Sequence, residues 1–136
     1  LHVHPAVMEL VLKLKGANGI ILVSDSIRAG GMHEGEYEFA DQKVYMKNKK
    51  AVLEDGTLAG STLTLNMAVK NMIETANARI TEAVRMASVN GAKVVNMESR
   101  KGILAVGKDA DVVVLDKAYQ VDMTIINGKI EYQKLA

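Results

Sequence analysis

The sequence predicts an α/β fold that combines a parallel sheet with antiparallel strands. Three observations predict it: a strand–helix–strand pattern occupies the first 24 residues, polar and apolar residues alternate near the middle, and three strand-like segments follow residue 101. With 136 residues the chain is long enough to bury a core. It is too short for a complete (β/α)8 barrel, which takes about 250 residues.

The first pattern is a βαβ unit. Residues 6–15 place apolar side chains at helical spacing, and Gly16 stops the helix. Residues 20–24 form a continuous apolar run, typical of a parallel strand buried on both faces. With residues 1–3 as the end of a preceding strand, the chain begins inside a parallel sheet. The apolar helical positions are Val7, Leu10, Val11 and Leu14.

The next segment predicts a hairpin with one solvated face. Residues 36–39 and 43–47 alternate polar and apolar side chains, as a half-buried antiparallel pair does. Residues 51–53 follow as a third short strand. A glycine-rich loop over residues 55–61 then leads into helical sequence.

Two helices are predicted after that loop. Ser61 is placed to be the N-cap of the first, because a serine oxygen can accept a free backbone N–H. The second helix starts at Thr81 and is stopped by Asn90–Gly91. The apolar face of the first helix is Leu65, Ala68, Val69, Met72 and Ile73.

The end of the chain predicts a separate group of strands. Asn127–Gly128 is a strong hairpin signal, because both residues tolerate positive φ. A domain boundary is therefore expected near residue 101, which gives domains of residues 1–101 and 102–136. The predicted strands are residues 111–115, 121–126 and 129–132.

Composition excludes several function classes. Lys and Arg number 17 against 16 Asp and Glu, so the chain has no basic field to hold nucleic acid or an anionic membrane. It has no cysteine, which excludes a disulfide framework, a thiolate metal site and a Cys nucleophile. The longest apolar runs stop after four residues, so no membrane-spanning helix is expected. No targeting motif is visible, and the cytoplasm is the expected location.

Asp25 is the acid best placed for chemistry. It directly follows the predicted strand 20–24, at the carboxyl end where parallel sheets build their sites. Partial burial there would raise the pKa of its carboxyl group toward the range useful for proton transfer. A capping role in the next turn competes with this interpretation.

Two further candidate sites are weaker. His2 and His4 lie two apart on a predicted strand end, so both could reach one metal ion, although a single His2 facing a cleft competes with that pair. Leu58, Ala59 and Gly60 precede a helix, where the backbone can approach a ligand closely. The two carboxylates of Asp109 and Asp111 flank a turn without a third ligand, which favours a solvated loop over a metal site.

Four motifs in order resemble the N-acetylglucosamine-6-phosphate deacetylase family of the amidohydrolase superfamily. They are LHVHP at residues 1–5, LVSD at 22–25, DGTLAGS at 55–61 and GILAVGKDAD at 102–111. The first and third are particular to the sugar-phosphate deacetylases, whereas the last is shared across the superfamily. The resemblance runs over essentially the whole chain.

The resemblance implies a fold and a set of roles. The fold is the C-terminal part of a (β/α)8 TIM barrel with a β-hairpin insertion, followed by strands of a small β-sandwich domain. Asp25 matches the catalytic Asp after the eighth barrel strand and His2 a substrate-contacting His after the seventh. Leu58, Ala59 and Gly60 match a substrate-binding loop.

The resemblance also implies the reaction. In the family a divalent metal, Zn or Fe, activates a water that attacks the acetamide carbonyl, and the Asp moves the proton. The products are glucosamine 6-phosphate and acetate. The family's metal ligands, one Glu and two His, have no counterparts in this sequence, and neither His4 nor His33 matches them. We therefore expect a fragment that has no deacetylase activity by itself.

Two other interpretations remain open at this stage. The chain could belong to a sister amidohydrolase, dihydroorotase-like or adenine-deaminase-like, because Asp25 and the motif at 102–111 serve all of them, although the loop at 55–61 argues against it. It could also be a non-catalytic domain that reuses the fold. The expected partner is a sugar phosphate, with a homodimer in the parent enzyme and association of the fragment through exposed strand edges.

Overall fold

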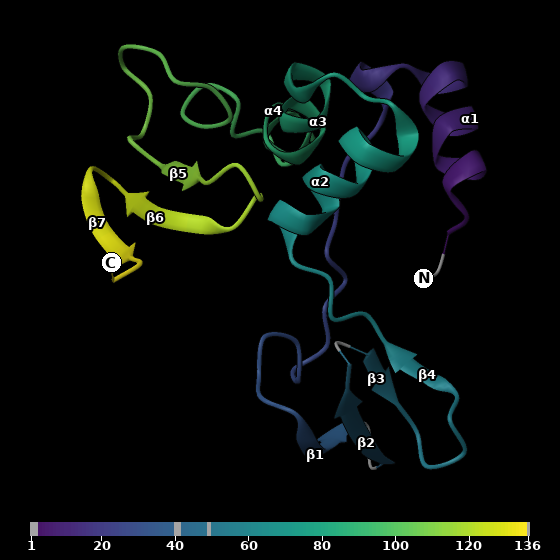
Figure 1. The fold of residues 1–136 in the computed structure, drawn as a ribbon. Helices are drawn as coiled ribbons and strands as arrows, with labels where there is room; N and C mark the ends of the chain where they lie inside the picture. The colour runs from purple at the N-terminus through teal and green to yellow at the C-terminus, as the bar shows by residue number, and fades with distance from the viewer. Residues whose placement is uncertain (1–2, 40–41, 49, 136) are drawn as a thin grey trace. The chain divides into compact units, whose positions relative to one another are not determined.

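The computed structural model describes residues 3–39, 42–48 and 50–135. It divides into two compact units, each described by itself (Figure 1). Unit 1 comprises Leu1–Leu22 and Asn66–Ala136, and unit 2 comprises Val23–Leu65. The predicted boundary near residue 101 falls within unit 1 and stays a prediction. Among the described residues, no helix has the length and apolar character needed to cross a membrane.

Unit 1 opens with the predicted helix, α1 (Pro5–Lys15). His4 is its N-cap, since the Nδ1 of His4 accepts the amide N–H of Ala6 at 3.2 Å, and Gly16 ends it at a φ of +66°. The predicted apolar face of this helix is exposed. Met8 and Leu12, one turn apart, make the packing contacts with the core instead.

Three further helices complete the core of unit 1. They are α2 (Leu65–Ala76), α3 (Ile80–Ala87) and α4 (Val89–Val94), with a short 3-10 turn, η1 (Ala17–Gly19), after α1. Met86 and Ala83 of α3 are fully buried against Met72 of α2. Methionine suits these core positions, because its flexible apolar side chain fills irregular gaps.

The predicted stop at Asn90–Gly91 is wrong. The helix ends at Ser88, whose backbone leaves the helical region, and Asn90 and Gly91 lie inside the next helix, α4. Asn90 is buried because its side-chain amide donates to the carbonyls of Ala17 and Ile20, at 2.7 and 2.6 Å. A buried amide with two partners outweighs the turn preference of the Asn–Gly pair.

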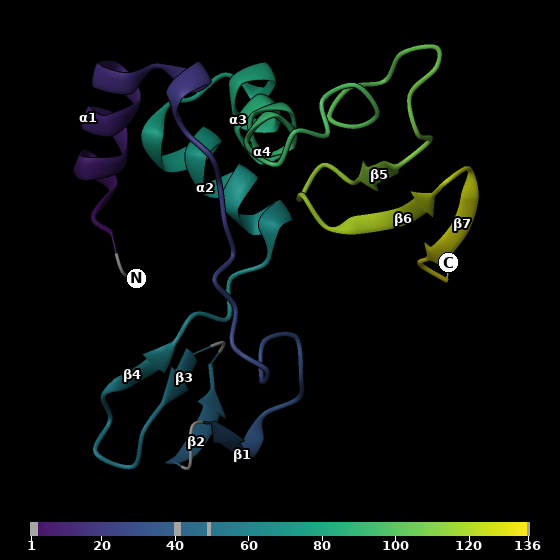
Figure 2. The same cartoon turned by 180° about the vertical axis from the view of Figure 1, so that it is seen from behind.

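The three strands at the end of the chain are confirmed. They are β5 (Val112–Leu115), β6 (Val121–Ile126) and β7 (Lys129–Gln133), in the order β5-β6-β7. Figure 2 shows them from behind, and each strand pairs antiparallel with the next. Asn127, in the turn between β6 and β7, has a φ of +50°. The Asn66 side chain donates to the Tyr119 carbonyl at 2.7 Å, so the β5–β6 loop contacts α2.

Unit 2 is a four-stranded antiparallel sheet in the order β1-β2-β3-β4. The predicted hairpin and third strand are confirmed as β1 (Gly35–Phe39), β2 (Gln42–Lys47) and β3 (Lys50–Val52). The predicted loop contains a fourth strand, β4 (Leu58–Gly60). Ala29, Val44, Met46 and Ala51 form the buried core of this unit.

The predicted parallel strand at residues 20–24 is not paired as a strand in the described chain. The segment is extended, and the side chains of Ile21 and Val23 are 40% and 67% exposed rather than buried. A parallel strand needs neighbours on both sides to cover it, and none lies along this segment among the described residues. The described part of the chain accordingly holds two small antiparallel sheets and no closed barrel or sandwich.

Candidate functional site

The candidate site is built around Asp25 in unit 2. Its backbone has a φ of +47°, in the left-handed region that few residues other than glycine, Asn and Asp adopt. Its side chain is exposed, and among the described residues it makes no hydrogen bond or ion pair. The expected partial burial is therefore wrong for this chain, because the segment before Asp25 has no covering strands.

Ser61 holds the backbone on both sides of Asp25. The Ser61 hydroxyl donates to the Ser24 carbonyl at 2.8 Å, and the Ile27 amide donates to the Ser61 carbonyl at 3.0 Å. Ser26 and Ser61 form an isolated parallel bridge. This bridge is the one parallel pairing in the described chain, and it brings the residue after β4 beside Asp25.

Gly60 allows this close approach. Its φ is +156°, and an added Cβ would lie 2.4 Å from the Cγ2 of Ile27. A side chain at position 60 would therefore push Ile27 away, together with the backbone just after Asp25. The glycine in the predicted substrate loop thus has a packing reason in addition to any role toward a ligand.

Leu58, Ala59 and Gly60 belong to an edge strand rather than a loop. They form β4, which pairs with β3 through Ala51–Gly60 and Val52–Leu58. Leu58 is 39% exposed, whereas Ala59 packs against the core of unit 2. The structure therefore places β4 and Asp25 in the same unit, linked through Ser61.

The turn before β4 is stabilised by Asp55. Its carboxylate accepts the amide N–H of Thr57 at 2.8 Å, and this hydrogen bond holds the pKa of Asp55 below its ordinary value. The Leu53 amide donates to the Thr57 carbonyl at 2.8 Å and closes the turn. Asp55 thus serves local structure, as an Asx turn does.

The predicted capping role of Ser61 is wrong. The helix α2 starts at Leu65, four residues later, and the Ser61 oxygen accepts the amide N–H of Leu63 at 3.1 Å. The contact with Ser24 spans 37 positions in the sequence. No local sequence pattern could have revealed this contact. The sequence analysis therefore missed the role of Ser61 and Ile27 beside Asp25.

The predicted metal pair of His2 and His4 stays a prediction. His2 lies outside the described residues, and the ring of His4 is engaged as the N-cap of α1. Among the described residues, no three or more His, Cys, Asp or Glu side chains gather as a metal site would require.

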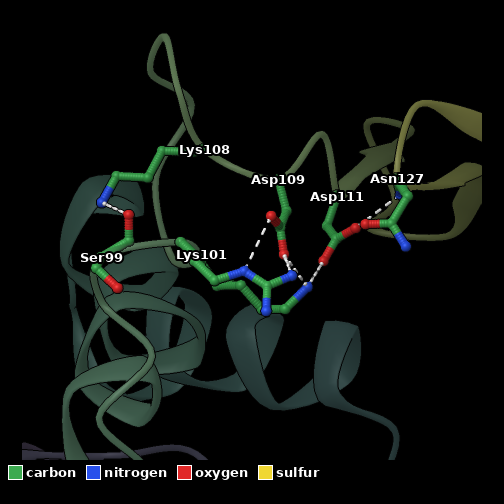
Figure 3. Close-up of polar contacts among 7 residues, drawn as sticks. Ser99, Lys101, Lys108, Asp109, Asp111 and Asn127 are labelled. Atoms are coloured by element: carbon green, nitrogen blue, oxygen red, sulfur yellow. Dashed lines mark hydrogen bonds and ion pairs between the residues drawn. The ribbon is translucent and has the colours of Figure 1, made fainter.

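A pair of aspartates, Asp109 and Asp111, lies in unit 1, in the motif at residues 102–111 (Figure 3). Asp109 pairs with Arg100 and Lys101, each at 2.9 Å. Asp111 contacts Lys101 and accepts the amide N–H of Asn127 at 2.9 Å. The hydrogen bonds from Lys101 hold the pKa of both carboxyl groups below the ordinary value.

This cluster of Arg100, Lys101, Asp109, Asp111 and Asn127, here called the ionic clasp, ties three segments together. They are the turn after α4, the segment that leads into β5 and the β6–β7 turn. The neighbouring Lys108 ammonium donates to the Ser99 carbonyl at 3.0 Å and also contacts the Glu98 carbonyl. The motif at residues 102–111 therefore has a structural role in this chain.

Comparison with protein families decides the membership of the chain. The model of the amidohydrolase family matches residues 2–130. The chain belongs to the amidohydrolase family. The resemblance carried by the four motifs is thereby confirmed, and the match covers both the Asp25 region and the ionic clasp.

The chain is similar to several sugar-phosphate deacetylases. N-acetylglucosamine-6-phosphate deacetylase of Bacillus subtilis is 40% identical over 132 residues, which is 97% of this chain and 33% of that protein. A putative N-acetylgalactosamine-6-phosphate deacetylase of Escherichia coli is 36% identical over 129 residues, 95% of this chain and 77% of that protein.

A solved amidohydrolase structure agrees with the fold. The crystal structure of N-acetylglucosamine-6-phosphate deacetylase from Thermotoga maritima matches with a TM-score of 0.86 and 40% identity, over 98% of this chain and 37% of that chain. The chain spans about a third of the length of most of the relatives it matches. The arrangement of helices and strands in this chain is thus similar to one part of that enzyme structure.

Proposed function

We propose that this chain forms part of a metal-dependent deacetylase that hydrolyses N-acetylglucosamine 6-phosphate to glucosamine 6-phosphate and acetate. The observation that carries the proposal is Asp25, an exposed carboxylate without a charged partner among the described residues, on a backbone fixed in the left-handed region. A proton-transfer group must stay accessible to substrate and water, and the exposed carboxylate of Asp25 meets this requirement. The similarity to sugar-phosphate deacetylases supports the substrate class.

In this proposal Asp25 moves one proton twice. Its carboxylate takes a proton from the water that adds to the acetamide carbonyl carbon. It then gives that proton to the amine nitrogen as the carbon–nitrogen bond breaks, so that acetate and the free amino sugar leave. His2 and the strand Leu58, Ala59 and Gly60 are proposed to contact the sugar phosphate.

A divalent metal, Zn or Fe, is not assigned to residues of this segment. The described residues do not gather a set of three or more ligand side chains, and Asp109 and Asp111 are already paired with cations. In this proposal the metal of the parent enzyme is held by residues outside the described chain. The proposed role of this chain is proton transfer and sugar binding.

A second substrate is supported by one comparison. The Escherichia coli relative named for N-acetylgalactosamine 6-phosphate is 36% identical, and this chain covers 77% of it. The two sugars differ in the configuration of one hydroxyl group, so the same proton transfer serves both. The relatives support either deacetylase over a dihydroorotase-like or adenine-deaminase-like enzyme.

A hybrid enzyme tests the proposal. The full chain replaces the matching third of the Bacillus subtilis enzyme, and metal-dependent acetate release is measured with each of the two N-acetylated sugar phosphates. We expect activity on N-acetylglucosamine 6-phosphate, and an Asp25→Asn loss of about 10²–10⁴-fold in kcat, the range for a removed general base.

Asp122→Asn is the matched control in the hybrid. Asp122 is a half-exposed carboxylate on β6, 3.9 Å from the Lys134 ammonium, and it lies in unit 1 outside the proposed site. We expect its kcat to stay within about twofold, because exposed ion pairs contribute little. An Asp25→Asn hybrid as active as this control would refute the catalytic role of Asp25.

A further inference from the structure

We propose that Ser61 is the positioning residue for Asp25, and that its hydroxyl group holds the Asp25 backbone in the left-handed conformation needed for proton transfer. The inference rests on the proposed function, because it assigns Ser61 a role in the same reaction. It concerns only unit 2. Ser61 acts through Asp25 and is not assigned a contact with the reacting atoms.

The contacts of Ser61 enclose Asp25 from both sides. The hydroxyl donates to the carbonyl of Ser24, the residue before Asp25, at 2.8 Å. The Ser61 carbonyl accepts the amide N–H of Ile27, two residues after Asp25, at 3.0 Å. One residue therefore anchors the peptide planes that lead into and out of the segment 25–26.

Anchored peptide planes determine the backbone of Asp25. The Ser24 carbonyl lies in the peptide plane that precedes Asp25, so fixing that carbonyl restricts φ of Asp25. The observed φ of +47° is less favourable for Asp than for glycine, so contacts that fix this peptide stabilise it. The Ser61 hydroxyl supplies the one described side-chain hydrogen bond to this peptide.

Packing around the segment supports the same role. Ile27 lies against Gly60, where an added Cβ would come within 2.4 Å of its Cγ2. Gly30 lies against Ser26, where an added Cβ would come within 1.9 Å of its Oγ. Position 61 follows Gly60 directly, so the hydrogen bonds and the close packing act on the same four residues, 24–27.

The conformational claim is tested on the full chain by NMR. The variants are Ser61→Ala, which removes the hydroxyl, and Ser61→Thr, which keeps it. We expect Ser61→Ala to lose the short intraresidue amide-to-Hα distance that a positive φ gives Asp25. Ser61→Thr should retain it. An Asp25 backbone that is unchanged in Ser61→Ala overturns the proposal.

Ser88→Ala is the matched control. The Ser88 hydroxyl also donates to a backbone carbonyl, that of Val84 at 2.7 Å, but it lies in unit 1. Its removal should leave the Asp25 signals unchanged. If Ser61→Ala no longer shows the amide signals of the β1–β4 sheet, the variant has unfolded and Ser61→Thr decides the question. A Ser61→Thr variant with an intact sheet but a changed Asp25 backbone overturns the proposal.

The catalytic claim is tested in the hybrid enzyme. We expect Ser61→Ala to lower kcat about tenfold, the scale of one hydrogen bond, with KM changed less than about twofold. Ser61→Thr should restore most of kcat. In an Asp25→Asn background Ser61→Ala should cause no additional loss, because the two residues act as a unit.

The outcomes separate this proposal from the proposed function. A tenfold additional loss in the Asp25→Asn background means that Ser61 acts independently of Asp25 and overturns the positioning role. An Asp25→Asn hybrid with full activity refutes proton transfer by Asp25 and with it the catalytic claim for Ser61, whereas a hybrid with no activity, even with Asp25 intact, overturns the proposed function. The NMR experiment decides independently whether Ser61 fixes the Asp25 backbone.

Discussion

Asp25 and the ionic clasp use the same chemical group in opposite ways. Asp109 and Asp111 are surrounded by the cations Arg100 and Lys101, and the resulting hydrogen bonds lower the pKa of both carboxyl groups. Asp25 has no such partner in the described chain, and its position is fixed through backbone contacts with Ser61.

The difference separates a structural from a functional carboxylate. A paired carboxylate holds segments together, but its charge is already satisfied and its proton affinity is reduced. A carboxylate held by its backbone keeps both oxygens free for a ligand, at the cost of a less favourable φ. Substitutions in the backbone segment around Asp25 and in the ionic clasp should therefore change stability and activity in different ways.

Gly60→Ala should have the largest effect on stability, because the new side chain displaces Ile27 and the backbone segment that holds Asp25. The new Cβ would lie 2.4 Å from the Cγ2 of Ile27 at a φ of +156°, so unit 2 should lose about 1–3 kcal/mol of unfolding free energy. Urea unfolding followed by the amide signals of the β1–β4 sheet measures this loss.

Gly56→Ala is the control for the Gly60 variant. Gly56 also has a positive φ, +84°, but an added Cβ would meet nothing within 4 Å. Its expected loss is about 1 kcal/mol, from backbone strain alone. Equal losses at the two positions would contradict the close-packing explanation for Gly60.

Asp25→Gly should have the next largest effect, with the opposite sign. Glycine adopts a φ of +47° without the penalty of a Cβ, so unit 2 should gain about 1 kcal/mol while the proposed activity is lost. Asp122→Gly, in the extended strand β6, should instead lower the stability of unit 1. A loss of stability in Asp25→Gly would show that the aspartate side chain itself supports the fold.

Most secondary structure could be predicted from local sequence. The alternation in β1 and β2 and the Asn127–Gly128 turn each specify their element within a few residues. The helix α1 was likewise predicted to within one residue at its start. Its buried face was not, because that depends on which neighbours cover it, and Met8 and Leu12 contact the core rather than the larger apolar stripe.

The site could be predicted only in part. Asp25 was identified from its place after an apolar run, but its exposure was not, since burial of residues 20–24 depends on neighbouring strands that no local pattern specifies. The link from Ser61 to Ser24 joins positions 37 apart and has no periodic signal. The roles of His2, Leu58, Ala59 and Gly60 stay predictions.

Acid should weaken the ionic clasp, and this is the smallest of the expected effects. The pKa values of Asp109 and Asp111 are lowered in the folded state, chiefly by hydrogen bonds from Lys101, so folding favours their ionised forms. The stability they contribute is therefore present above the ordinary Asp pKa, about 3.9, and is lost as the pH falls through their lower folded values.

Asp109→Asn measures this contribution. The variant should unfold more easily than the parent chain at pH 7, and the difference should shrink below about pH 4 as the parent's own carboxylates take up protons. Lys101→Met should remove the same acid-dependent difference, because that side chain contacts both carboxylates. A difference that is as large at pH 2.5 as at pH 7, on the scale of ordinary Asp titration near 3.9, would show that Asp109 stabilises unit 1 through packing rather than charge.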